Sequence, residues 1–247
     1  MGIETTSGEA RRGRFDKERT RQAILDAARE EFAQHGLSGA RVDAIAARTN
    51  AVKRMIYYYF GSKEGLYLAV LEQAYAAIRE AEQQLDLLGL PPVEAIRRLI
   101  GFTFDYQEAN PGFIRLVSIE NIHNGAHMAR SEKIQKLNSV VVETLATILE
   151  RGRKQGVFRD DVDAVDVHML ISAFCFFRVS NRHTFGLLFG RDLSDPALRD
   201  RHKRLVADAV LRTLEYRKER VGRDAEENEN IMNEKAGGEQ KESRAAA

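Results

Sequence analysis

The stretch from Arg41 to Phe60, RVDAIAARTNAVKRMIYYYF, places the strongest constraint on the fold of this chain. Val42, Ile45 and Ala46 fall on one face of a short helix, and a second short helix follows a polar turn. We expect Asn50 to close that turn, because asparagine tolerates the left-handed backbone conformation that a sharp turn needs. Two short helices joined in this way predict a helix-turn-helix, whose second helix can lie in the major groove of DNA.

Helical periodicity continues through the rest of the 247 residues, without the alternation typical of strands. We therefore expect an all-α fold, with an N-terminal three-helix unit that contains the helix-turn-helix and a larger C-terminal helical domain. The sequence Gly-Leu-Pro-Pro at 89–92 is a natural boundary. The expected segments are a disordered basic arm over 1–15, the DNA-binding domain over 16–62 with its motif at about 40–59, a connecting helix over 63–87, a helical domain over 91–218 and a disordered charged tail over 219–247.

Charge is distributed unevenly, although the formal net charge of the chain is only +1. Between Ala10 and Arg21 there are six basic and two acidic residues, just before the predicted motif. Basic residues in this place can neutralise DNA phosphates, although a merely solvated basic segment is the simpler interpretation. The tail over 219–247 is acidic instead, with eight acids and five bases.

Several other functions are disfavoured by the sequence. The single cysteine, Cys175, lies in an apolar run and is interpreted as a buried small side chain. No apolar run reaches the ~18 residues of a membrane span, so we expect a cytoplasmic protein without a membrane partner. The sequence has no glycine-rich phosphate loop or nucleophile elbow, so we expect neither an enzyme nor a cofactor. His123 and His127 have helical spacing, but Gly125 between them favours a solvated loop over a metal site.

The helix expected at 164–183 is apolar around almost its whole circumference. A helix of this kind is buried on all sides, so one face would pack in the subunit core and another against a partner. A further helix is expected at 196–218. These two helices predict a four-helix seam between two copies of the chain.

The stretch from Thr20 to about Tyr75 resembles the TetR family of transcriptional regulators. The likeness is carried, in order and spacing, by the blocks ILDAA at 24–28, FAQHG at 32–36, VDAIA at 42–46, IYYYF at 56–60 and SKEGL at 62–66. The resemblance implies a homodimeric repressor that binds a palindromic operator in double-stranded DNA and is released by a small organic effector. In that case the domain over 91–218 binds the effector and forms the dimer. An activator, or a protein-interaction module without DNA binding, is the alternative.

The resemblance places the recognition helix at about 53–59. It implies that Arg54 and Met55 read base edges, and arginine is well suited to guanine. Phosphate contacts, which position a protein without specifying sequence, fall to other residues of the motif. These implied phosphate contacts are Lys53, Tyr57, Tyr58 and Lys63.

Two positions depart from the usual family pattern. Arg41 stands where the family commonly has threonine, and Asn50-Ala51-Val52 stands where it commonly has Gly-Val-Ser. Val52 cannot supply a serine hydroxyl to a helix cap or a phosphate. Arg41 can reach a phosphate instead, so we count it among the DNA contacts.

Polar residues on and near the apolar helix suggest an effector pocket, because such groups are costly in a core unless they find partners. The alternative is that they are satisfied structurally or lie at the subunit seam. The run SNRHTF at 180–185 is faintly similar to family members that regulate the catabolism of N-heteroaromatic acids such as nicotinate. The candidate residues for an aromatic or anionic effector are Phe104, Arg115, Asn121, His168, Asn181 and His183.

Overall fold

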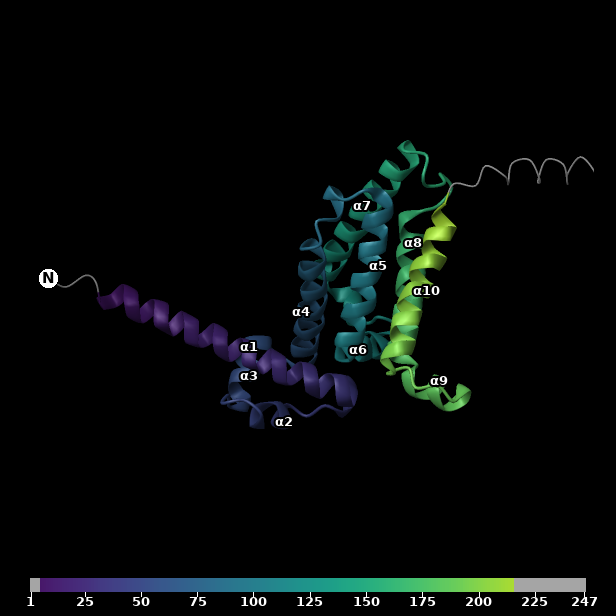
Figure 1. The fold of residues 1–247 in the computed structure, drawn as a ribbon. Helices are drawn as coiled ribbons and strands as arrows, with labels where there is room; N and C mark the ends of the chain where they lie inside the picture. Colours follow the sequence, from purple (N-terminus) through teal and green to yellow (C-terminus); the bar gives the residue numbers. More distant parts are fainter. Residues whose placement is uncertain (1–4, 216–247) are drawn as a thin grey trace, which may run out of the picture.

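The computed structural model describes the backbone of residues 5–215 and side chains from Asp16 onward, and the described part is helical, as predicted (Figure 1). Ten α-helices and two short 3-10 turns make up the described residues. The helices are α1 (Thr5–Gly39), α2 (Val42–Ala47), α3 (Lys53–Phe60), α4 (Lys63–Gln83), α5 (Pro92–Ala109), α6 (Pro111–Ile122), α7 (Glu132–Lys154), α8 (Ala164–Ser180), α9 (Arg182–Phe189) and α10 (Pro196–Leu214); the 3-10 turns are Leu87–Gly89 and Met128–Arg130.

The N-terminal unit consists of α1, α2, α3 and the first half of α4. These helices enclose one core that includes Ile24, Phe32, Ile45, Ile56 and Tyr67. Figure 1 shows α1 running outward, with α2 and α3 beneath it and α4 rising toward the other helices. The core holds α3 against α1 and α4, so the helix-turn-helix is presented on the outer side of the molecule.

The start of α1 and the end of α10 differ from the prediction. The first helix begins at Thr5 and not at Asp16, so the segment from Thr5 is helical where a disordered arm was expected. Between Thr5 and Phe15 the sequence has three arginines, one glutamate and one alanine, which favour helix, and two glycines, which do not. The last helix ends at Leu214, four residues before the expected end at 218, and the tail predicted over 219–247 lies outside the described residues.

The turn between α2 and α3 is closed by Thr49, in place of the predicted left-handed Asn50. Within residues 5–215, only Asp86 and Asn124 combine a positive φ with a side chain, so Asn50 is not left-handed. The Thr49 hydroxyl lies within hydrogen-bond distance of the Ile45 carbonyl oxygen and accepts the Ala51 N–H at 3.3 Å. The turn is therefore stabilised by hydrogen bonds between the Thr49 side chain and the backbone, and not by a left-handed Asn50.

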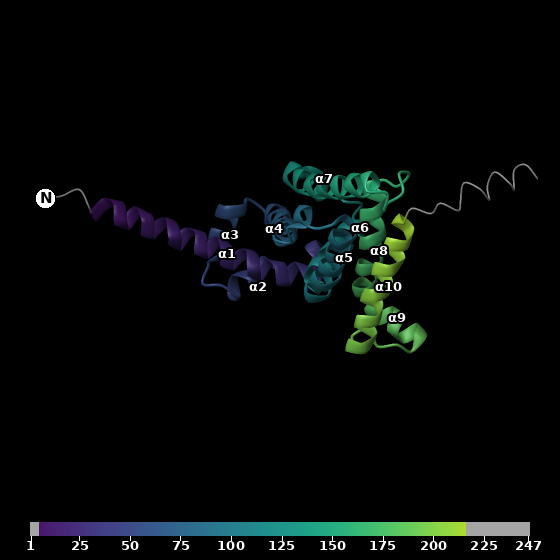
Figure 2. The ribbon, with the colours of Figure 1, turned by 45° about the horizontal axis from the view of Figure 1, so that its top comes forward.

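The C-terminal domain is built around α5. Its core includes Ile96 and Phe104 from α5, Leu145 from α7, Ile171 from α8 and Val210 from α10. Figure 2 shows α5 between α7 on one side and the pair α8 and α10 on the other. The apolar faces predicted for these helices therefore meet in a single core.

The segment expected as one helix over 164–183 is divided into α8 and α9 at Asn181, and α9 was not predicted. The Asn181 side-chain amide donates to the Ser180 hydroxyl at 2.8 Å. Short polar side chains that bond locally in this way compete with helix continuation. The chain changes direction there, and α9 ends at Gly190, whose φ is +61°.

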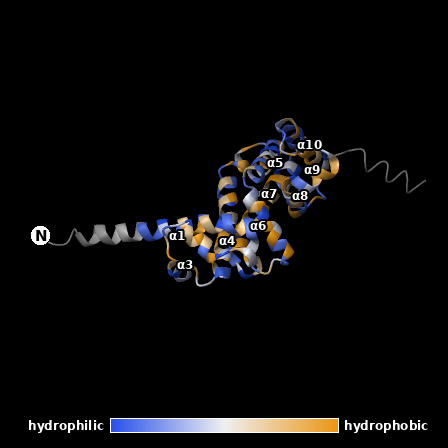
Figure 3. Ribbon diagram, turned by 90° about the horizontal axis from the view of Figure 1, so that it is seen from below, coloured by the Kyte–Doolittle hydropathy of each residue, from blue (hydrophilic) through white to orange (hydrophobic). Residues whose placement is uncertain are grey.

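One face of α8 is apolar and exposed in the single chain. Val165, Met169, Ala173 and Phe177 recur at every fourth position, and Met169 is 63% exposed. Leu205 on the neighbouring α10 is exposed as well. Figure 3 shows hydrophobic residues along α8 and α9. The prediction that one face of this helix packs in the subunit core is therefore confirmed, and the exposed stripe is the face that was predicted to meet a partner. Over residues 5–215, no helix is both long enough and apolar enough to cross a bilayer.

Candidate DNA-binding interface and effector pocket

The recognition helix α3 has one face in the core and one face in solvent. Ile56 is 1% exposed and anchors the helix, whereas Tyr58 on the opposite side is 77% exposed. Arg54 is exposed as well, as the base-reading role requires, but Met55 is half-buried against the N-terminal core. Of the predicted DNA contacts, Arg41, Lys53, Arg54, Tyr57 and Tyr58 are exposed, and Met55 and Lys63 are half-buried.

The two lysines already have acceptors within the chain. Lys53 Nζ lies 3.0 Å from Asp43 Oδ1, and both side chains are largely exposed. Lys63 Nζ donates to the Ser38 carbonyl oxygen at 3.3 Å. Exposed ion pairs of this kind contribute only about 0–1 kcal/mol. The pair between Lys53 and Asp43 is therefore weak enough for Lys53 to exchange Asp43 for another acceptor.

Glu31 on α1 organises the start of α2, which the sequence analysis did not identify. Its side chain is almost fully buried, and its Oε1 accepts the backbone N–H of Arg41 at 3.1 Å. Its Oε2 lies 3.5 Å from Arg48 Nη2. The N-terminus of α2 therefore has a carboxylate cap from another helix, since Arg41 itself supplies no side-chain cap.

The junction between α3 and α4 requires a glycine at position 65. Ser62 caps α4 by accepting the Gly65 N–H at 3.0 Å. A Cβ atom on Gly65 would lie 2.2 Å from the Phe60 carbonyl oxygen. The end of the recognition helix therefore sits directly against the first turn of α4.

We expect Gly65→Ala to destabilise the protein by about 1–3 kcal/mol, because the backbone of Phe60 must move to admit the methyl group. Thermal unfolding followed by circular dichroism measures the change. Gly101→Ala is the matched control, since its Cβ would meet only the flexible end of Lys203 at 3.4 Å. An unchanged unfolding temperature for Gly65→Ala would contradict the close packing of the two helices.

The structure does not bring the six predicted effector residues together. Phe104 lies in the core, with the guanidinium carbons of Arg178 and Arg199 at 5.2 and 5.7 Å from its ring centre. Asn121 donates to the Val117 carbonyl oxygen, and His168 Nε2 lies 3.5 Å from the Ser172 hydroxyl.

Burial, together with the nearby charge of Arg79, lowers the pKa of His168 below its usual value. Asn181 bonds to Ser180, as described above. Arg115 and His183 line the same cavity, a groove of about 780 Å³ between the end of α1, α6 and the junction of α8 with α9.

Glu120 is a second buried carboxylate that the sequence analysis did not identify. It lies on α6, is 1% exposed, and its Oε1 is 2.8 Å from His127 Nδ1. Its Oε2 accepts the backbone N–H groups of His127 and Met128 at 3.2 and 3.1 Å. Burial, with the adjacent Glu120 carboxylate, raises the pKa of Tyr67 on α4 above its usual value. Glu120 therefore lies where α6, the loop after it and α4 meet.

A second polar network joins α5, α8 and α9. Glu108 accepts from Arg178 Nε and from Arg182 Nη2, both at 2.9 Å. Arg178, which is 2% exposed, also donates to the Leu193 carbonyl oxygen, and its Nη1 lies 2.7 Å from His202 Nδ1. Burial lowers the pKa of Arg178, while Glu108 opposes that shift. Arg178 therefore has a structural role within the C-terminal domain.

A solvent-exposed recognition helix held by a three-helix core and attached through α4 to a separate helical domain defines a helix-turn-helix DNA-binding regulator. Comparison with protein families agrees. Residues 24–70 match the model of the bacterial regulatory proteins of the tetR family, and residues 92–210 match that of the tetracyclin repressor-like C-terminal domain.

Individual relatives extend the match over most of the chain. The HTH-type transcriptional repressor NicS of Pseudomonas putida is 38% identical over 197 residues, which cover 80% of this chain and 93% of NicS. The repressor SCO4008 of Streptomyces coelicolor is 32% identical over 79% of this chain and 97% of its own length. The crystal structure of the putative transcriptional regulator SCO4942 from Streptomyces coelicolor superposes with a TM-score of 0.62 and 29% identity, covering 79% of this chain and 98% of that one. The chain belongs to the TetR family of transcriptional regulators.

Proposed function

We propose that this TetR-family regulator is a repressor that binds a palindromic operator as a homodimer and is released by a small organic effector, aromatic or anionic. The observation that carries the proposal is the recognition helix, which exposes Arg54 and Tyr58 on a face held rigid by Ile56. The names of the relatives support repression. We propose no enzymatic activity and a cytoplasmic location, where a bacterial regulator meets DNA.

The exposed stripe on α8 supports the homodimer. Val165, Met169, Ala173 and Phe177 form one apolar line, and Leu205 of α10 lies on the adjacent helix. A twofold axis would pack α8 and α10 of one copy against α8 and α10 of the second. This four-helix interface would remove these side chains from water. The two recognition helices would then enter successive major grooves about 34–36 Å apart.

The roles of the exposed basic residues give a direct test. Arg54→Ala is expected to weaken binding to the operator by about 1–3 kcal/mol while leaving binding to unrelated DNA nearly unchanged, since arginine reads guanine. Lys63→Ala is expected to weaken binding to all sequences and to reduce the salt dependence of the affinity by about one phosphate contact per subunit. Fluorescence anisotropy with operator and scrambled duplexes, at two salt concentrations, measures both effects.

Arg97→Ala serves as the control, because Arg97 is exposed on α5, outside the DNA-binding unit. Equal losses on every sequence for Arg54→Ala and Lys63→Ala would contradict the assigned roles. Absence of any salt-dependent DNA binding by the unaltered chain would instead favour a protein-interaction module.

A further inference from the structure

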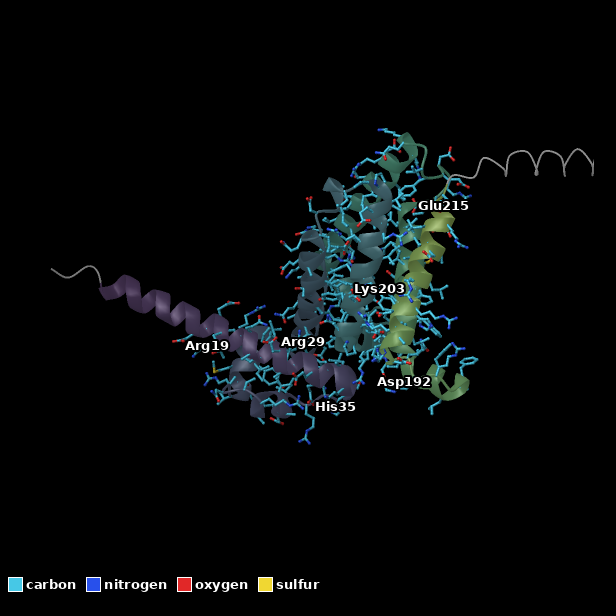
Figure 4. The ribbon with its side chains drawn as sticks, viewed as in Figure 1. Arg19, Arg29, His35, Asp192, Lys203 and Glu215 are labelled. Atoms are coloured by element: carbon cyan, nitrogen blue, oxygen red, sulfur yellow. The ribbon has the colours of Figure 1, made fainter. Side chains whose placement is uncertain are left out.

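The groove that contains Arg115 lies where the DNA-binding unit meets the C-terminal domain. Its volume of about 780 Å³ is in the range of small-molecule sites. One wall is the end of α1, from Ala33 to Ser38, and the other walls are α6 and the start of α9. Figure 4 labels His35 at this end of α1. A ligand in the groove would therefore touch both units at once.

The polar part of the lining is basic. It contains Arg115, Arg182 and the three histidines His35, His123 and His183, and no carboxylate. Arg115 is exposed and makes no ion pair with any other described residue. Arg182 is held by Glu108, but its Nε is buried without a hydrogen-bond partner. The Arg115 guanidinium therefore supplies positively charged donors that no described residue pairs with, and such donors suit a carboxylate or a similar anion.

The remaining lining is apolar. The apolar lining consists of Ile114, Ile119 and Ile122 of α6, Leu37 of α1 and Val179 of α8. Ile122 is 75% exposed, so this part of the apolar lining is accessible to a ligand. Burying this surface would favour a ligand with an apolar body in addition to its charged group.

We propose that this groove is the effector site and that its ligand is a small organic anion with an apolar body. The inference rests on the proposed function, because an effector is part of it. The anion pairs with Arg115 and Arg182, and the apolar body lies along the isoleucines of α6. The site differs from a pocket enclosed within the C-terminal helices, since α1 forms one of its walls.

The position of the groove also supplies a route to the DNA-binding surface. Ser38 lines the groove, and its carbonyl oxygen accepts from Lys63, one of the proposed phosphate contacts. Glu120 lies on α6, the same helix as Arg115, and its Oε1 is 2.8 Å from His127 Nδ1. The His127 ring packs edge-on against the ring of Tyr67 on α4, with 5.1 Å between the ring centres. A ligand that contacts both α1 and α6 would favour one position of α1 relative to α4, because α6 also contacts α4 through its carboxylate cluster. The ligand would thereby change the fraction of molecules whose recognition helices are placed to bind DNA.

The test uses naphthalene-2-carboxylate as the probe and the uncharged naphthalene-2-carboxamide as its matched control. Isothermal titration calorimetry on the full chain is expected to show carboxylate binding at least tenfold tighter than carboxamide binding. Arg115→Ala is expected to weaken the carboxylate at least tenfold, because a charge-assisted hydrogen bond is lost. Arg115→Lys should restore part of the affinity. Arg97→Ala should change it less than twofold.

The second readout is operator affinity, which the carboxylate is expected to lower for the unaltered chain but not for Arg115→Ala. The inference is overturned if the carboxylate does not bind, if it binds Arg115→Ala as tightly as the unaltered chain, or if carboxamide binds equally well. Carboxylate binding through Arg115 in a chain that binds no DNA would overturn the proposed function and leave the groove as an anion site. DNA binding with carboxylate affinity independent of Arg115 would overturn this inference alone.

Discussion

Replacing Met169 with glutamate is expected to dissociate the proposed homodimer into monomers and to lower operator affinity by at least about 100-fold. Met169 is 63% exposed in the centre of the apolar stripe on α8. In a twofold interface the substitution buries a carboxylate on each side, without a partner, and an unpaired buried charge is strongly unfavourable. A single subunit then loses the high effective concentration of its second half-site.

Light scattering after gel filtration measures the mass, which should fall to that of one 27.9 kDa chain. Anisotropy with the operator measures the affinity. Val140→Glu is the control, because Val140 is an exposed valine on α7, away from the stripe. An intact fold by circular dichroism is required of both variants. A Met169→Glu protein that stays dimeric would place the dimer interface elsewhere.

Replacing Glu120 with alanine is expected to lower the free energy of unfolding by about 3–5 kcal/mol. The substitution removes the acceptor for His127 Nδ1 and for two backbone N–H groups in a nearly fully buried place. Removing one partner of a buried polar cluster leaves the other polar groups buried without hydrogen bonds, and this accounts for most of the lost free energy of unfolding. For a chain of this size the midpoint of thermal unfolding should fall by roughly 10 °C.

Two comparisons separate this effect from a general loss of charge. Glu120→Gln keeps an oxygen for the backbone N–H groups, so it should lose less than half as much stability. Glu143→Ala removes an exposed carboxylate from α7 and should change stability by less than about 0.5 kcal/mol. If Glu120→Ala were no less stable than Glu143→Ala, the cluster around Glu120 would not hold α4, α6 and the loop together.

Local features of the helices could be predicted from the sequence because they depend on neighbours in the chain. Ser62, Asp163 and Asp195 cap α4, α8 and α10 through hydrogen bonds that span two or three residues. Gly36, at the kink near the end of α1, and Gly156, just after α7, both have a positive φ, which glycine adopts readily. Each of these features depends only on residues within a few positions in the chain, so a short stretch of sequence is enough to predict it.

The polar clusters could not be predicted, because each joins residues far apart in the sequence. Glu31 caps α2 from another helix, and the His127 ring held by Glu120 packs against Tyr67 of α4, which lies sixty residues earlier than His127. A helical stripe shows which face is apolar but not which helix it meets. For the same reason, Phe104 and Arg115 were grouped by chemistry, whereas the structure places one in the core and the other in the groove.

The central claim is that two recognition helices are held at one fixed interval, and the spacing of operator half-sites tests it most directly. An operator selected from random duplexes by the full chain is compared with the same operator after insertion of ~5 base pairs at its centre, which is about half a helical turn. We expect a palindromic operator, two chains per duplex and at least a 100-fold loss of affinity after the insertion. Equal affinity for the two duplexes, or a selected site without twofold symmetry bound by one chain, would contradict the account.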